Sequence, residues 1–149
     1  VNFNDNLGMF SWVSRQDLSE RDQKAAKDSY ESFRELVARF PDSRYAQDAR
    51  QRMTYIINSL AQYEVHVARY YFQRGAYVAA IGRAQTALSD YEAVPAHEEA
   101  LYILVLSYDA LGMAPLRDDA RRVLDKNYPN SSFMAQGFKG KSDPWWKLW

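Results

Sequence analysis

The stretch DSRYAQDARQRMTYIINSLAQYEVHVARYYFQR, residues 42–74, decides how this chain folds. It contains neither Gly nor Pro, so nothing in its backbone chemistry interrupts a helix. Its apolar residues recur in alternating steps of four and three, which indicates a helix that packs along its length. We predict one unbroken helix over about 43–74, capped by Ser43 and ended by Gly75. The apolar stripe consists of Ala49, Met53, Ile56, Leu60, Tyr63, Val67 and Tyr70.

The composition of the 149 residues limits what the chain can be. Its formal net charge is zero, which argues against a nucleic-acid-binding protein that relies on phosphate contacts. Because there is no Cys, disulfides, thiol catalysis and Cys-ligated zinc are excluded. No apolar run approaches the roughly 20 residues that span a bilayer. The sequence opens on Val1, without a Met or a signal peptide, so we expect it to be a fragment of a longer protein.

Four further helices are predicted from apolar periodicity and from the Gly and Pro residues between them. The region before them, residues 1–22, mixes Asn, Asp and Gly with apolar side chains, and we expect an irregular insertion there. Ser19 and Asp22 would then cap the first helix. Since no stretch alternates with period two, we expect an all-α fold without a sheet. The four helices are predicted over about 22–40, 77–91, 96–111 and 115–128.

A repeated motif indicates how these helices are arranged. FPDSRY at residues 40–45 matches YPNSSF at residues 128–133 nearly position for position, and Tyr91 holds the aromatic position between them. In each copy the aromatic would fill the seam between hairpins, the Pro would end a helix, and the Ser would cap the next. Helices of this length joined by short turns are typical of tetratricopeptide repeats. We therefore predict a tetratricopeptide-like superhelix of stacked helical hairpins over residues 1–133, with one unusually long helix.

These features together resemble the C-terminal part of the BamD family, the tetratricopeptide lipoproteins of the machinery that assembles β-barrel proteins in the Gram-negative outer membrane. The resemblance runs over residues 1–128. Its most specific part is the pattern Leu-Ala-x-Tyr-Glu-x-x-Val-Ala-x-Tyr-Tyr-x-x-Arg-Gly-Ala at residues 60–76, which Val78, Ala79 and Arg83 follow. No general rule of tetratricopeptide packing requires that set of residues.

The resemblance implies a non-enzymatic scaffold at the periplasmic face of the outer membrane. It implies docking onto the last POTRA domain of BamA and onto accessory lipoproteins. It also implies contact with unfolded outer-membrane protein substrates, mainly through N-terminal repeats outside this chain, which would carry the lipid anchor as well. Arg83 matches a family arginine implicated in the BamA contact. It lies off the apolar face of Ile81 and Ala84, so we expect it to be exposed and to act in docking rather than folding. We expect Arg74 and Tyr77 to bind partners too.

No catalytic, cofactor or metal site is predicted. His66 and His97 lie on different helices without a partnered Ser, Cys or carboxylate motif. We interpret His66 as an ordinary flank position of the long helix and His97 as part of a solvated helix start. There is neither a Gly-rich phosphate loop nor metal-ligand spacing. The alternative function is a generic tetratricopeptide adaptor that binds a short peptide in its concave groove.

The last segment, residues 134–149, departs from the repeat pattern. Its aromatic and basic residues are typical of membrane-interface anchors. The alternatives are a disordered tail or a segment that covers the last repeat. Because Gly137, Gly140 and Pro144 prevent a continuous helix, we expect residues 137–149 to be dispensable for the fold. The residues expected to contact a partner or a membrane are Trp145, Trp146, Lys147 and Trp149.

Overall fold

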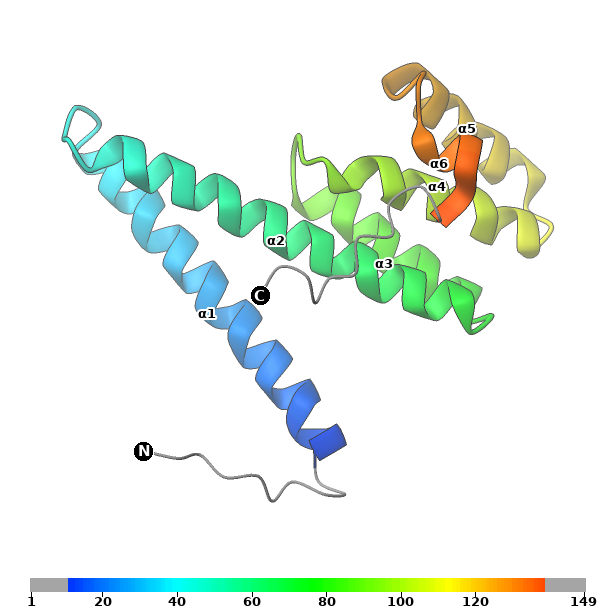
Figure 1. Cartoon of the computed structure of the whole chain (residues 1–149), viewed down its shortest axis with the longest axis horizontal. Helices are drawn as coiled ribbons and strands as arrows, with labels where there is room; N and C mark the ends of the chain where they lie inside the picture. The colour runs from blue at the N-terminus through cyan, green and yellow to red at the C-terminus, as the bar shows by residue number, and fades with distance from the viewer. Residues whose placement is uncertain (1–10, 139–149) are drawn as a thin grey trace. The chain divides into compact units, whose positions relative to one another are not determined.

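The computed structural model describes residues 11–138, and that part of the chain is helical with no strand (Figure 1). The predicted all-α fold is therefore confirmed. Short turns that contain Gly or Pro separate the helices. The bounds are α1 Ser11–Arg39, α2 Ala46–Gln73, α3 Tyr77–Asp90, α4 Ala96–Ala110, α5 Ala114–Asn127 and α6 Ser132–Gln136.

The first helix, α1, begins earlier than predicted. The expected irregular insertion over residues 1–22 is wrong for residues 11–22, which are helical, while residues 1–10 lie outside the described part. Ser19 and Asp22 consequently lie inside α1 and do not cap it. The physical reason is that Gly8 is the last helix-breaking residue before Pro41, and the Asn-rich cluster ends before it.

The long helix α2 runs unbroken from Ala46 to Gln73, as its freedom from Gly and Pro predicted. Its predicted start at Ser43 is wrong. The chain between Phe40 and Ala46 forms turns, in which the N–H of Ser43 bonds the carbonyl oxygen of Phe40 at 3.1 Å and the N–H of Ala46 bonds that of Ser43 at 3.0 Å. The backbone of Ser43 is thus engaged in turns, and its hydroxyl caps no helix.

Two glycines end helices as predicted. Gly75 adopts a φ of 75°, and the N–H groups of Gly75 and Ala76 bond the carbonyl oxygens of Phe72 and Tyr71, both at 3.0 Å. These two bonds form a Schellman motif, which needs a left-handed residue that Gly adopts without strain. Gly112, with a φ of 69°, ends α4 by the same pattern of bonds.

The chain divides into two compact units at Leu60, inside α2. The first holds α1 and the first half of α2. Among residues 22–60, the buried ones are Ala46, Ala49 and Leu60, and larger apolar side chains such as Phe33 and Met53 are only half-buried. Arg52 on α2 places its guanidinium 6.0 Å from the ring of Phe33 on α1. This unit is a helical hairpin with a thin core.

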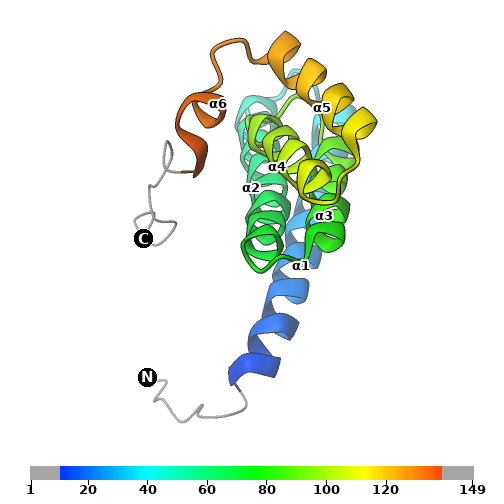
Figure 2. The ribbon, with the colours of Figure 1, turned by 90° about the vertical axis from the view of Figure 1, so that its right-hand side faces the viewer.

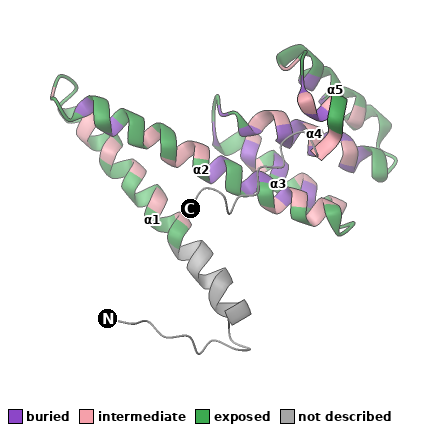
Figure 3. Cartoon of the chain, viewed as in Figure 1, coloured by how far each residue is buried: buried purple, intermediate pink, exposed green. Residues whose placement is uncertain are grey.

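The second unit holds the rest of α2 and the helices α3 to α6, and α4 is at its centre. The sequence of α4, AHEEALYILVLSYDA, is apolar around most of its circumference, as expected for a buried helix. The other helices α3, α5 and α6 pack against it. Figure 3 shows buried residues concentrated on α4 and on the helix faces turned towards it. The fully buried apolar side chains of α4 include Ala100, Ile103 and Leu104.

The buried face of α2 in this unit differs from the predicted stripe. Tyr63 and Tyr70 are exposed, whereas Ala61, Val65 and Ala68 are completely buried. The alignment of α2 beside α3 explains the shift (Figures 1 and 2), because α3 offers a face of small residues. Alanine faces let two helix backbones approach closely, and tyrosines are too large for such a contact. The buried alanines of α3 are Ala80, Ala84 and Ala87.

A substitution in α2 tests the packing of the first unit, to which Leu60 belongs. Leu60 is buried, as predicted, and Leu60→Ala should lower the free energy of unfolding by about 2–3 kcal/mol, the lower part of the range for buried leucines. The lower part applies because its neighbours Ile56 and Ile57 are half-buried and can relax into the space. Urea unfolding followed by circular dichroism measures the change. A loss below about 0.5 kcal/mol, which is typical of surface positions, would contradict the described packing.

No helix in residues 11–138 combines the length and the hydropathy that crossing a bilayer requires.

Candidate protein-docking surface

Arg83 lies in the middle of α3, which continues without a break through the preceding Gly82. The sequence predicted a helix here, although Gly82 weakens helix propensity. The hydroxyl of Thr86 bonds the carbonyl oxygen of Gly82 at 3.0 Å, and Ala80, Ala84 and Ala87 of α3 are buried. Arg83 is therefore presented by a rigid element rather than by a loop.

The guanidinium of Arg83 forms an ion pair with a buried carboxylate. Its Nη1 donates to Oε2 of Glu64 on α2 at 3.1 Å, and the Glu64 side chain is only 7% exposed. Removing one partner of such a pair leaves an uncompensated buried charge. The expectation that Arg83 takes no part in folding is therefore wrong. The Arg83 side chain is nevertheless 45% exposed, so part of the guanidinium reaches the surface.

The environment of Glu64 includes a phenol at the end of α3. Tyr91 is buried, and burial is the first cause that raises the pKa of its hydroxyl. The negative charges of Glu64 and then Asp90 raise that pKa further. Sequence reasoning did not single out Glu64 as the partner of Arg83. The signal that could have identified Glu64 was a carboxylate placed between the apolar residues Tyr63 and Val65 of the long helix.

Arg74 and Tyr77, which the sequence also predicted as partner-binding residues, flank the turn at Gly75. The guanidinium of Arg74 lies over the ring of Tyr70, 4.4 Å from its centroid. The ring of Tyr77 contacts Phe72 at a centroid distance of 5.6 Å. The structure thus places all three predicted side chains on the α2–α3 hairpin, each against a different residue of α2.

Exposed apolar side chains accompany these residues. Val78 on α3 is 73% exposed, and the rings of Tyr63 and Tyr70 on α2 also reach solvent. Tyr and Arg are the residue types that most often dominate binding energy in protein interfaces. These exposed side chains of the α2–α3 hairpin are therefore chemically suited to contact with a protein. The sequence reasoning had assigned both tyrosines to the core, because their spacing matched the helical period.

The two histidines lie on different helices, His66 on α2 and His97 at the start of α4. Nε2 of His97 lies 2.5 Å from the carbonyl oxygen of Tyr91 and 3.2 Å from that of Ala87, so it donates its proton to them. The predicted solvated environment of His97 is therefore wrong, because its half-buried ring ties the start of α4 to the end of α3. Within residues 11–138, no group of three or more His, Cys, Asp or Glu side chains could hold a metal ion.

Stability should depend on pH through His66. Burial first, and the positive charge of Arg69 second, lower the pKa of its imidazole below the ordinary value of 6.5. An imidazole with a lower pKa in the folded state makes the protein less stable when the ring is protonated. The free energy of unfolding should therefore be highest above about pH 6.5 and decrease as the pH falls towards the folded pKa.

The effect should be small, since the imidazole is partly exposed. Urea midpoints measured from about pH 7.5 to pH 5.5 should fall, and His66→Gln should reduce that fall. An identical pH dependence in the variant would show that another group is responsible.

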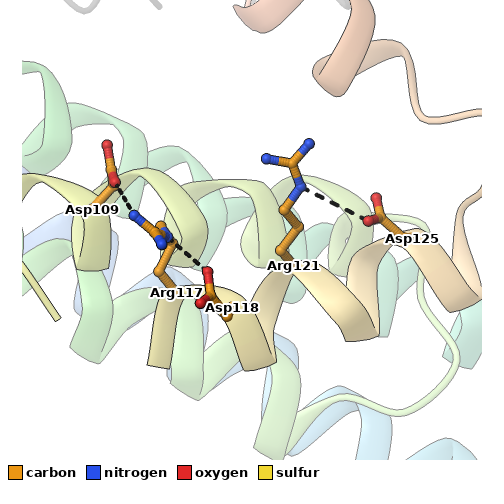
Figure 4. A network of polar contacts seen from close by, with 5 residues as sticks. All are labelled: Asp109, Arg117, Asp118, Arg121 and Asp125. Carbon is orange, nitrogen blue, oxygen red and sulfur yellow. Dashed lines mark hydrogen bonds and ion pairs between the residues drawn. The ribbon is translucent and has the colours of Figure 1, made fainter. Parts of the chain in front are cut away.

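A separate group of charges lies on the α4–α5 hairpin (Figure 4). Arg117 bonds Asp118 through Nε and Asp109 through Nη1, both at 2.9 Å, and these two carboxylates raise the pKa of its guanidinium. Farther along α5, Arg121 and Asp125 form a looser pair at 3.8 Å. These side chains are largely solvated, so their ion pairs contribute little to stability.

The predicted tail divides into two parts. Trp145, Trp146, Lys147 and Trp149 lie outside the described residues. The part up to Phe138 is described, and Phe138 packs against Tyr102 on α4 with a centroid distance of 5.2 Å. The expectation that residues 137–149 are dispensable for the fold is therefore wrong at Phe138.

Comparison with known proteins identifies one family and several relatives, and these agree with one another. The family described as "Outer membrane lipoprotein" (YfiO) matches residues 6–124. An outer membrane protein assembly factor BamD of Neisseria meningitidis serogroup A is 44% identical over 149 residues, which is 100% of this chain and 56% of that protein. One from Xylella fastidiosa strain Temecula1 is 42% identical over 128 residues, 86% of this chain and 42% of that protein. The chain thus spans about half the length of the curated relatives it matches.

Proposed function

The chain belongs to the YfiO family of outer membrane lipoproteins, and from that membership we propose that it is a non-enzymatic scaffold in the assembly of outer-membrane β-barrel proteins. In this proposal it works at the periplasmic face of the outer membrane. It docks onto the periplasmic POTRA region of BamA and onto accessory lipoproteins. It also contacts unfolded outer-membrane protein substrates.

The observation that supports docking is the arrangement of Arg83. Glu64 holds one nitrogen of its guanidinium, and the half-exposed remainder can donate hydrogen bonds to a partner. A guanidinium oriented in this way loses less conformational entropy on binding than a free side chain would. Exposed Tyr70, Val78 and Arg74 lie on the same hairpin and supply the apolar and cationic area that a folded domain could cover.

The alternative, an adaptor that binds a short peptide in a concave groove, has less support. Such a groove is lined by the first helices of successive hairpins, which here are α2 and α4. Phe138 already lies against Phe72 of α2 and Tyr102 of α4. A peptide would have to displace this segment before it could bind there, whereas a folded domain on the Arg83 surface would not.

A pull-down tests the proposed function. The immobilised chain should retain the purified periplasmic region of BamA, and deleting the last POTRA domain should abolish retention. Arg122→Glu, on the exposed side of α5, is the matched charge-changing control for Arg83→Glu, and this control variant should retain BamA normally. Equal retention with and without the last POTRA domain would overturn the proposed site of docking, and no retention at all would overturn the proposed partner.

A further inference from the structure

An aromatic cluster joins the end of the described chain to two earlier helices. The ring of Phe138 lies 5.7 Å from that of Phe72 on α2 and 5.2 Å from that of Tyr102 on α4. Phe133 on α6 stacks on the same Tyr102 at 5.7 Å and is only 1% exposed. Two phenylalanines five residues apart thus occupy neighbouring places on one surface.

The backbone between them is shaped for this contact. Gly137 ends α6 with a φ of 64°, and its N–H bonds to the carbonyl oxygen of Phe133. A Cβ at Gly137 would lie 3.6 Å from the hydroxyl oxygen of Tyr102, so the backbone at Gly137 passes close to the Tyr102 side chain. The left-handed residue reverses the chain direction after α6, and the reversal brings Phe138 back onto α2 and α4.

A buried ion pair lies beside Phe138. Nε of Arg69 on α2 donates to Oε1 of Glu99 on α4 at 2.5 Å, and the Glu99 side chain is almost fully buried. The guanidinium of Arg69 lies 5.7 Å from the centroid of the Phe138 ring, within the range of a cation–π contact. The surface under the ring therefore combines two aromatic rings with a cation whose charge is held in place by Glu99.

This segment, residues 132–138, lies beyond residues 6–124, which match the YfiO family. The Neisseria relative matches the whole chain and so extends over the segment as well. The helices α2 and α4, which form the surface beneath it, belong to the part shared with the family. The segment thus lies outside the stretch that the family description matches and inside the stretch that the Neisseria relative matches.

We propose that residues 132–138 act as an intramolecular ligand, here called the strap, for an aromatic-binding site on α2 and α4. The site consists of Arg69, Phe72 and Tyr102, with the Arg69–Glu99 pair as its polar edge. When the strap is displaced, the site takes a peptide segment that carries two aromatic side chains five residues apart and adopts the same helical turn as the strap. The inference goes beyond the proposed docking function, since it involves neither Arg83 nor BamA.

The strap competes with any free peptide because it is tethered. A short link to α5 gives it an effective concentration on the order of millimolar, so a free peptide of equal intrinsic affinity binds the intact chain poorly. Replacing Phe133 and Phe138 of the strap by Ala should remove this competition. The side chains that form the site, Arg69, Phe72 and Tyr102, are unchanged in such a variant, and circular dichroism checks that it stays folded without the Phe133 ring.

The test uses the full chain and a fluorescent synthetic peptide, NSSFMAQGF, which copies residues 130–138. The Phe133→Ala/Phe138→Ala variant should bind this peptide at least about 10-fold more tightly than the unmodified chain in fluorescence anisotropy. A peptide with both Phe replaced by Ala should bind neither. Tyr55→Ala, which removes an exposed ring from the other unit, is the matched control and should behave like the unmodified chain.

Failure of the folded double variant to bind the peptide, or equal binding by the unmodified chain, would overturn the proposal. If circular dichroism shows that the double variant is unfolded, a protease site inserted between Asn130 and Ser131 decides the matter. After cleavage the strap should remain bound without a covalent link and exchange with the fluorescent peptide. A cleaved chain that unfolds, or that stays folded without exchange, would show that the segment is only part of the fold.

Discussion

Phe133→Ala is expected to lower the free energy of unfolding by about 3–5 kcal/mol, the range measured for buried aromatic residues. Its side chain is 1% exposed and stacks on Tyr102, so truncation leaves a cavity beside α4. Aromatic pairs also contribute about 0.5–1.5 kcal/mol beyond the area they bury. Urea unfolding monitored by circular dichroism measures the loss.

The matched control is Tyr45→Ala, because Tyr45 occupies the corresponding position of the repeated motif and yet is 57% exposed. This substitution should change the free energy of unfolding by no more than about 0.5 kcal/mol. Comparable losses at Tyr45 and Phe133 would contradict the described packing of α6. If Phe133→Ala lowers the free energy of unfolding by less than about 1 kcal/mol, that result would also contradict the described packing, since truncating a large buried side chain costs more.

Arg83→Glu is expected to impair both stability and docking. It places a second carboxylate against buried Glu64, and breaking a buried ion pair costs about 3–5 kcal/mol. Since the Arg83 side chain is 45% exposed and solvent screens part of the charge, we expect about 2–3 kcal/mol. If Arg83 also contacts BamA, binding should weaken by about 100-fold, as for other desolvated charges at interfaces.

A charge-swapped variant separates the two effects. Glu64→Arg/Arg83→Glu restores an opposite pair and should recover a large part of the lost stability, measured by urea unfolding. Its affinity for the periplasmic region of BamA, measured by titration calorimetry, should stay low because the surface now presents a carboxylate. Recovery of both quantities together would show that Arg83 acts only in folding.

Most of the helical architecture could be predicted because it depends on local chemistry. Freedom from Gly and Pro predicted the unbroken α2, and Gly75 and Gly112 marked the helix ends at which the structure has left-handed residues. The start of α1 was missed because its polar, weakly periodic sequence offers little signal. The five-residue α6 is too short for its periodicity to show, although the repeated motif did single out Phe133.

The face that each helix buries was harder to predict. Periodicity could not distinguish the stripe of Tyr63 and Tyr70 from the stripe of Ala61, Val65 and Ala68, since both have the helical period. The alanine face of α3 decides between them, and that is a tertiary property. The resemblance pointed to Arg83, but its partner Glu64 is 19 residues away on another helix. Only the packed hairpin brings their charges together.

Photo-crosslinking from the Arg83 surface tests the central claim most directly. Ala79 is exposed on α3 and lies four residues before Arg83, which puts both on one face of the helix. With p-benzoylphenylalanine at position 79, illumination in the presence of the BamA periplasmic region should link the chain to the last POTRA domain. The same residue at position 122, on the exposed side of α5, should give no such product. Absence of the product at position 79, or an equal yield at position 122, would contradict docking through this surface.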